Sequence, residues 1–158
     1  MLHLIPAPLH RAALRIAHRL RARFRRLARP HIAGVSIIGT DRQGRVLLVR
    51  HSYGSGLWSL PGGGIGKAED PEAGARRELF EELGCEAEDV TLLSVLEERI
   101  SGAPHTAYVF ALTLVGEPRP DGREVIEAGM FAPDELPLRL SGLSRRRLDL
   151  WRERTGRD

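Results

Sequence analysis

Three glutamates, Glu78, Glu81 and Glu82, are the residues whose types and spacing best suit chemistry. Positions three and four residues apart lie on the same side of a helix, so these carboxylates would project within one arc. Like charges so close together repel each other, and hard divalent ions such as Mg²⁺ take carboxylate and carbonyl oxygens as ligands. The spacing therefore predicts a divalent-metal site on one face of a helix.

The helix that must present these glutamates is predicted over residues 71–83. Asp70 can cap it, Pro71 suits its first turn, and Gly84 can end it in the left-handed conformation. Its other face carries an apolar stripe for packing against a core, formed by Ala75, Leu79 and Leu83.

A cluster of glycines precedes this helix. A phosphate-binding P-loop does not fit, because Pro61 stands where its first glycine is required and Ala68 stands where it needs serine or threonine. A dinucleotide-binding fingerprint fails because Lys67 replaces its last glycine. The glycines instead favour a backbone that lets the carbonyl of Gly62 or Gly63 reach a metal.

Together these residues resemble the signature of the Nudix hydrolase family. Apolar Leu79 and Cys85 stand where the signature has bulky aliphatic residues, and residues 58–63 resemble the family's usual approach to it. The resemblance covers residues 31–158 and implies the Nudix fold, an α/β/α sandwich with a mixed sheet. The fixed positions that match are Gly63, Glu69, Arg77, Glu78, Glu81, Glu82 and Gly84.

The resemblance implies a Mg²⁺-dependent or Mn²⁺-dependent enzyme that splits a diphosphate bond. Such a reaction needs neutralised phosphate oxygens and an activated water, and a bound metal supplies both. Glu81 and Glu82 are predicted as the primary metal ligands, and Glu78 shares the metal or positions water. Arg77 is predicted to turn away from these carboxylates, pair with Glu69 and brace the loop.

The resemblance also implies a further acid outside the signature, as a fourth ligand or a base. Glu124 is the first candidate and Glu127 the reserve, and a solvated loop carboxylate is the alternative for Glu124. Glu97 and Glu98, at the end of a predicted strand, are weaker candidates.

Three residues near the loop over residues 51–57 are candidates for binding substrate. Tyr53 and Trp58 can stack on a nucleobase, and Arg50 precedes the same loop. For Trp58, an anchor in the core or loop is the favoured alternative, because tryptophan buries a large apolar area. Most of the scattered histidines are expected to be surface or hydrogen-bonded residues rather than ligands.

The implied substrate is a nucleoside diphosphate linked to another group, as in a nucleoside triphosphate or a nucleotide sugar. One alternative is a Nudix-fold module that senses a nucleotide, although it would not need the complete set of glutamates. Another is an RNA 5′ pyrophosphohydrolase, in which the arginine-rich N-terminal segment would bind the RNA.

Composition indicates one globular domain. Of 158 residues, 42% are apolar, which argues against disorder. A single cysteine excludes an internal disulfide, and neither a membrane span nor a secretory signal is found. We therefore expect a cytoplasmic protein, with peripheral attachment to a membrane as an option.

Residues 1–30 form a separate, basic segment. They contain eight arginines and no acid, which leaves 16 basic against 21 acidic residues in the rest of the chain. The basic pI therefore belongs to this segment, and binding to nucleic acid is not expected. Its apolar residues have helical spacing at positions 9, 13, 16, 20, 24 and 27.

Several roles remain open for this amphipathic helix, which Pro30 should end. Its apolar face can pack on its own domain or on a homodimer partner. Alternatively, residues 9–29 can bind an anionic membrane surface, or the segment is an organelle transit peptide.

The other predicted elements alternate strands with helices. Strands are predicted over residues 32–40, 45–51, 90–96 and 105–115 and around Met130 and Phe131, with a closing helix over 144–154. Strands flanked by helices on both sides predict a three-layer α/β/α domain.

Overall fold

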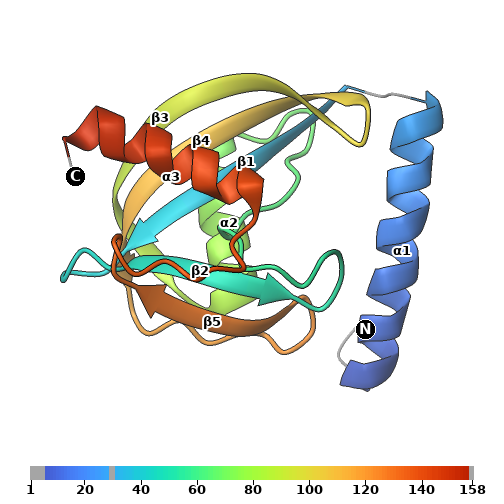
Figure 1. Cartoon of the computed structure of the whole chain (residues 1–158). Coiled ribbons are helices and arrows are strands. Elements are labelled where there is room, and N and C mark those ends of the chain that lie inside the picture. Colours follow the sequence, from blue (N-terminus) through green and yellow to red (C-terminus); the bar gives the residue numbers. More distant parts are fainter. Residues whose placement is uncertain (1–5, 29–30, 157–158) are drawn as a thin grey trace.

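In a computed structural model that describes residues 6–28 and 31–156, these residues form three helices and one five-stranded sheet. The predicted three-layer α/β/α arrangement is confirmed, with α2 on one face of the sheet and α3 on the other (Figure 1). The elements are α1 (Ala7–Ala28), β1 (Ile32–Thr40), β2 (Val46–His51), α2 (Pro71–Leu83), β3 (Glu86–Ile100), β4 (Ala103–Val115), β5 (Val125–Phe131) and α3 (Gly142–Thr155).

The sheet is mixed, as predicted, with strand order β3-β4-β1-β2-β5. β1 pairs parallel to β4, and the other neighbouring strands are antiparallel. Neighbouring residues of β1 enter opposite cores: Ile37 packs on the side of α2, and Ile38 on the side of α3. Burial on both faces explains why this strand is an almost continuous apolar run.

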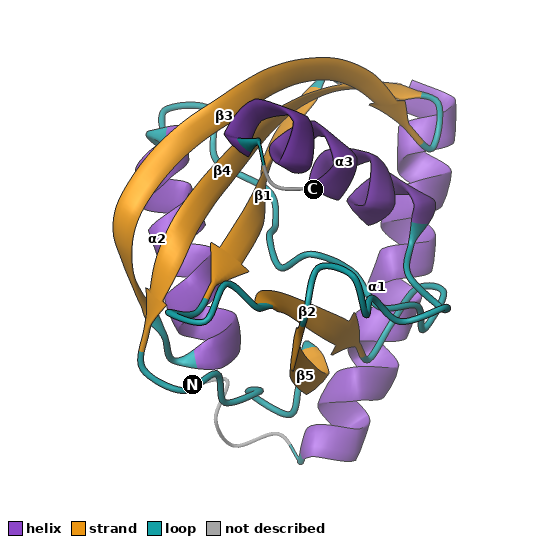
Figure 2. Cartoon of the chain, turned by 60° about the vertical axis from the view of Figure 1, so that its left-hand side comes forward, coloured by secondary structure: helices purple, strands orange, loops and turns teal. Residues whose placement is uncertain are grey.

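The two halves of the sheet diverge between β1 and β2 (Figure 2). The predicted hairpin forms at its turn, where Thr40 pairs with Val46, and the strands then separate. The sequence left open which face of β2 is buried. Residues 46–49 are all buried and alternate between the two cores, so both faces are.

Several element ends differ from the prediction. β3 extends four residues beyond the predicted strand at each end, and its hairpin turns at Ser101 and Gly102, which both have positive φ. β5 covers seven residues rather than a short stretch. α3 begins at Gly142, two residues before the predicted start, and is capped by Ser141; the Ser144 Oγ accepts a hydrogen bond from the Leu60 amide.

β3 is one of the two edge strands of the sheet, with β5 at the other edge. Its pairing with β4 is interrupted by two irregularities, which weaken an edge as a template for other strands. Leu92 and Val95 of this strand are exposed.

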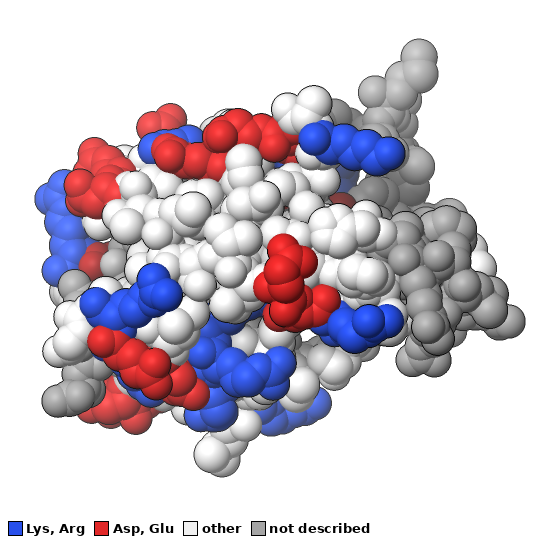
Figure 3. Space-filling view, turned by 90° about the horizontal axis from the view of Figure 1, so that it is seen from above, with Lys and Arg blue, Asp and Glu red and all other residues white. Residues whose placement is uncertain are grey.

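Seen from above, the molecule has a broad uncharged band bordered by acidic and basic side chains (Figure 3).

α1 stands beside the sandwich and contacts it through Arg11 and Arg15. Arg11 donates to the Gly122 carbonyl (2.8 Å) and Arg15 to the Ser52 carbonyl (3.1 Å). Pro8 is tolerated in its first turn, and Pro30, the expected end, lies outside the described residues. The apolar residues Leu9, Ile16 and Leu20 are exposed, so packing of this stripe on its own domain is not observed for them.

Candidate active site

A loop fills the space between the diverging strands. The Val35 amide donates to the Gly63 carbonyl and the Ile37 amide to the Pro61 carbonyl, both at 2.9 Å. On the other side, Ser59 exchanges two backbone hydrogen bonds with Val49. The loop therefore continues the hydrogen bonding of the sheet, and it is held as firmly as a strand.

Two glycines allow this loop to pass so close. Gly62 has φ +145°, and a Cβ there would lie 2.2 Å from the Val35 carbonyl oxygen. A Cβ on Gly63 would lie 2.5 Å from the Glu78 carboxyl carbon, so the loop backbone runs directly against that carboxylate. The Gly63 carbonyl already accepts a hydrogen bond from the Val35 amide, but a carbonyl oxygen has two lone pairs, so both carbonyls stay candidate metal ligands.

The three predicted glutamates lie on α2 but differ in burial. The predicted apolar stripe is fully buried. Of the glutamate side chains, Glu81 is 60% exposed, Glu78 is 14% exposed and Glu82 is only 5% exposed. The face of α2 that carries the glutamates is therefore not uniformly exposed, because Glu82 turns into the interior.

Glu82 is a buried carboxylate with one partner. Its Oε1 lies 3.3 Å from Nε2 of His51, whose Nδ1 lies 3.4 Å from the Ser59 hydroxyl. Its Oε2 is buried and has no hydrogen-bond partner within the part of the chain that the structure describes. Leaving a buried charged acceptor unpaired costs free energy, so this oxygen fits a cation.

The neighbouring carboxyl of Glu78 is also held in an unfavourable setting. Burial raises its pKa above the ordinary value, and the nearby charges of Glu82 and Glu81 add to the effect. The Arg77 guanidinium opposes the shift. A group whose ionised form is disfavoured by burial and by like charges is stabilised as a carboxylate when a cation binds beside it.

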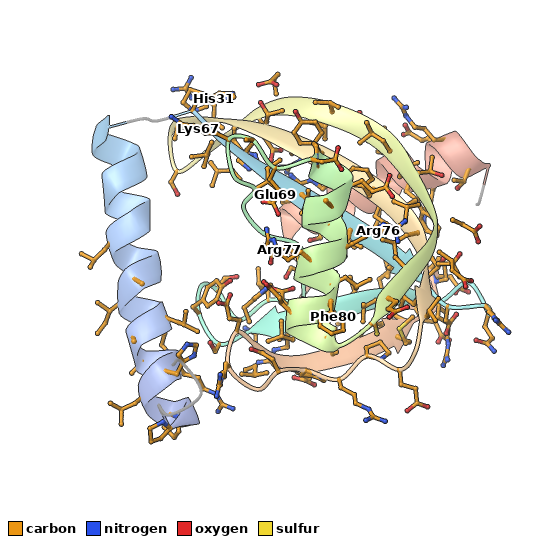
Figure 4. All side chains as sticks on the ribbon, turned by 180° about the vertical axis from the view of Figure 1, so that it is seen from behind. His31, Lys67, Glu69, Arg76, Arg77 and Phe80 are labelled. Carbon is orange, nitrogen blue, oxygen red and sulfur yellow. The ribbon has the colours of Figure 1, made fainter. Side chains whose placement is uncertain are left out.

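Arg77 links the helix to the loop. The predicted ion pair with Glu69 is present in bidentate form, at 2.7 and 3.2 Å, and Figure 4 shows the two side chains together. This contact and the Gly66 amide lower the pKa of Glu69. Arg77 is not turned away from the glutamates, however, because it also donates to Glu78 (2.8 Å) and Glu81 (3.2 Å).

A divalent ion such as Mg²⁺ requires several oxygen donors close together. Within residues 6–28 and 31–156, no three His, Cys, Asp or Glu side chains are close enough together to form a complete metal set. Arg77 forms ion pairs with two of the three glutamates, Glu78 and Glu81. The donors are nevertheless carboxylate oxygens beside a glycine backbone, one of them buried and unpaired, and such a set fits a hard ion such as Mg²⁺.

These groups line one cleft of about 1490 Å³. It runs from the glutamates of α2, over the glycine loop, to Arg147 of α3. Tyr53 and Glu124 also line it.

The other substrate-binding candidates lie elsewhere. Trp58 packs edge-on against Phe131, with ring centroids 5.0 Å apart, as expected of a core anchor. Arg50 pairs with Glu127, the reserve candidate for the acid, at 2.8 Å, and neither residue lines the cleft. Neither placement supports contact with substrate.

Sequence reasoning missed three residues. His51 contacts Glu82, while His105 and Arg147 are buried and line the cleft. The position of His51 at the end of a strand, directly before a glycine-bearing loop, was a usable signal. No local signal marked His105 or Arg147, because long-range packing brings them to the site.

The comparison with known families agrees with this geometry. The family model of the NUDIX domain matches residues 30–151. The chain belongs to the NUDIX family. This NUDIX chain is similar to the solved structure of the MutT NUDIX hydrolase from Burkholderia pseudomallei, with 32% sequence identity and a TM-score of 0.69. The match covers 77% of this chain and 98% of the Burkholderia chain.

Curated relatives match a shorter stretch of this NUDIX protein. An RNA pyrophosphohydrolase of Teredinibacter turnerae is 46% identical over 63 residues, which is 40% of this chain and 37% of that protein. The diphosphoinositol polyphosphate phosphohydrolase 3-alpha of Mus musculus is 39% identical over 75 residues, 48% and 45% of the two chains. The chain thus spans less than half the length of these relatives, which are named for different substrates.

Proposed function

We propose that this protein is a metal-dependent pyrophosphohydrolase that cleaves the phosphoanhydride bond of a nucleoside diphosphate linked to another group. The observation that carries the proposal is the buried, unpaired Oε2 of Glu82, beside a second carboxyl whose pKa burial raises. Membership of the NUDIX family supports the same chemistry. A sensor module would have no use for so costly a cluster.

The chain's own residues divide the work. Glu82, Glu81 and Glu78 hold the divalent ion, which supplies charge neutralisation of phosphate oxygens and a bound water of lowered pKa. Arg77, held by Glu69, keeps Glu78 against the glycine loop. Glu124 is placed in the same cleft and is proposed as the acid that accepts the proton of the attacking water.

The substrate class follows from what the relatives' names share. The RNA pyrophosphohydrolase and the diphosphoinositol polyphosphate phosphohydrolase both imply chemistry at a phosphoanhydride. A nucleoside triphosphate or a nucleotide sugar is our first proposal, because a cleft of about 1490 Å³ has room for more than a diphosphate. The 5′ end of RNA is the second, because residues 1–30 hold eight arginines.

The test is a substrate panel with the full chain. Nucleoside triphosphates, a nucleotide sugar and 5′-triphosphorylated RNA are incubated with Mg²⁺ or with EDTA, and released phosphate and pyrophosphate are measured. Glu82→Gln should reduce kcat/KM by about a hundredfold or more, since removing one group that stabilises transition-state charge commonly costs that much. The matched change Glu86→Gln, at an exposed glutamate outside the cleft, should leave turnover unaltered.

Either of two results would reject the proposal: turnover that does not need a divalent metal, or undiminished turnover by Glu82→Gln. Removal of residues 1–30 separates the two substrate classes. It should spare hydrolysis of small nucleotides, whereas an enzyme acting on RNA should lose RNA turnover. Thermal unfolding of the shortened chain checks that the domain is intact.

We also propose that α1 binds an anionic lipid surface. Its exposed Leu9, Ile16 and Leu20 lie in a segment rich in arginine, and each basic residue near such a surface contributes about 1 kcal/mol. No helix of the described residues is both long and apolar enough to cross a bilayer. Vesicles containing phosphatidylserine should sediment the protein, and those of phosphatidylcholine alone should not. Equal sedimentation of the protein with both kinds of vesicle, or with neither, would reject the proposal. Analytical ultracentrifugation of the protein without vesicles tests the homodimer.

A further inference from the structure

Arg147 is a buried cation that the proposed reaction does not use. It lies on α3, is only 8% exposed, and lines the cleft. Its terminal NH2 group donates to Glu98 at 2.6 Å, while its buried Nε has no hydrogen-bond partner in the described part of the chain. Burial lowers the pKa of Arg147, and Glu98 opposes the shift. An unpaired buried donor on the wall of a cleft points to a ligand.

Glu98 fixes the direction of this guanidinium. The same Oε1 atom that accepts from Arg147 also lies 3.1 Å from Nδ1 of His105. A Cβ on Gly34 would lie 3.0 Å from Nε2 of His105 and 2.8 Å from the Gly63 carbonyl, so the histidine packs close to the glycine loop. Glu98 and His105 thus act as positioning residues for Arg147.

This cluster and the glutamates line the same cleft from opposite faces of the sheet. Arg147 comes from α3 and the glutamates come from α2, which cover opposite faces of the sheet, and the glycine loop lies between them (Figure 1). A substrate whose diphosphate sits at the glutamates would cross the loop before it meets Arg147. The part of the substrate that faces Arg147 is therefore the group beyond the phosphates.

The local charge selects the chemistry of that group. The carboxylate of Glu98 already offsets the charge of Arg147, so the cluster does not provide the excess positive charge that a phosphate needs. A neutral acceptor such as a carbonyl oxygen fits better, because arginine can only donate. On the basis of the proposed function, we infer that Arg147 binds the carbonyl oxygen of a nucleobase and favours keto bases over amino bases.

The preference can be measured with pairs of triphosphates in which one base has a keto oxygen where the other has an amino group. The protonation of the adjacent ring nitrogen changes with it, and guanine also has a 2-amino group. UTP and CTP share their sugar and phosphates, as do GTP and ATP. A hydrogen bond from a charged donor contributes enough to change kcat/KM by about tenfold or more. We expect the full chain to favour UTP over CTP and GTP over ATP by such factors. Arg147→Met should reduce both ratios to near one.

Two controls separate recognition from stability. Arg146→Met makes the same change at an exposed position of the same helix and should preserve both ratios. Because Arg147→Met leaves Glu98 without its arginine and the variant can fail to fold, the unmodified protein is also titrated with UMP and CMP. The NMR resonance of the Arg147 Nε–H group should shift more strongly with UMP.

The outcomes distinguish this inference from the proposed function. Hydrolysis without a keto preference, together with equal shifts for UMP and CMP, overturns the inference and leaves the hydrolase proposal standing. A selective shift with UMP but no hydrolysis of any triphosphate supports the role of Arg147 and rejects the reaction. Persistence of the keto preference in Arg147→Met also overturns the inference.

Discussion

Replacing Glu82 with glutamine should make the metal-free protein more stable while removing its response to Mg²⁺. In the structure the carboxylate is almost fully buried, its Oε2 has no partner in the described residues, and Glu78 lies nearby with a raised pKa. The amide of glutamine has nearly the same size, keeps a hydrogen-bonding group beside His51, and carries no charge. The change therefore removes the repulsion and the unmet need for a cation together.

The expected gain is at most the cost of an unsatisfied buried charged group, about 1–3 kcal/mol, because the neutral amide still leaves one buried polar atom without a partner. For a chain of this length, each kcal/mol shifts Tm by roughly 2–4 °C. The wild-type protein, in contrast, should gain about 2.7 kcal/mol from Mg²⁺ at a hundred times its Kd, because the ion binds only the folded state. The variant should show little of that gain.

Thermal unfolding in EDTA and in Mg²⁺ measures both effects on the same samples. Glu81→Gln is the matched control: its side chain is 60% exposed, so its effect on the metal-free protein should stay within about 0.5 kcal/mol. A Glu82→Gln protein that unfolds at a lower temperature in EDTA would refute the reasoning about the buried oxygen. Stabilisation by Mg²⁺ equal to that of the wild type would refute its role as a ligand.

Two further predictions concern the loop and its brace. Gly62→Ala should destabilise the protein by about 1–3 kcal/mol or more, because the φ of Gly62 is +145° and a Cβ there would meet the backbone of β1. The control Gly64→Ala should be tolerated, because a Cβ at Gly64 has room. Urea unfolding compares the stability of the two variants. The pKa of Glu69 is lowered by Arg77, so its ionised form contributes stability above the ordinary pKa, and this is lost as pH falls through the lowered value. In an NMR titration the Gly66 amide should report a midpoint below that of an ordinary glutamate, and a midpoint at or above it would contradict the ion pair's effect.

The parts of the fold that could be predicted depend on local rules. The helix over residues 71–83 was placed correctly because Asp70 accepts from the Ala73 amide and Gly84 adopts the left-handed conformation, and both signals lie in the adjacent sequence. The family was recognised for a similar reason, since its signature falls within one loop and one helix. The metal ligands and the acid outside the signature stay predictions.

The features that could not be predicted depend on residues far apart in the chain. Spacing placed Glu81 and Glu82 on one arc, but only the packing of α2 against the sheet decides that Glu82 is buried and Glu81 exposed. His51 and Arg147 looked like ordinary polar residues because their partners lie 31 and 49 positions away. Propensity and periodicity contain no information about such pairs.

The hydrogen bonds that join the glycine loop to both β1 and β2 limit how this protein can diverge in evolution. Mutations at residues 61–63 would disturb the hydrogen bonding of the sheet and the candidate active site at once, so neither can change independently. The residues of α3 that line the cleft do not combine a role in the hydrogen bonding of the sheet with a role in the candidate active site. New substrates should therefore arise by exchange of side chains on that helix, while the loop is inherited unchanged.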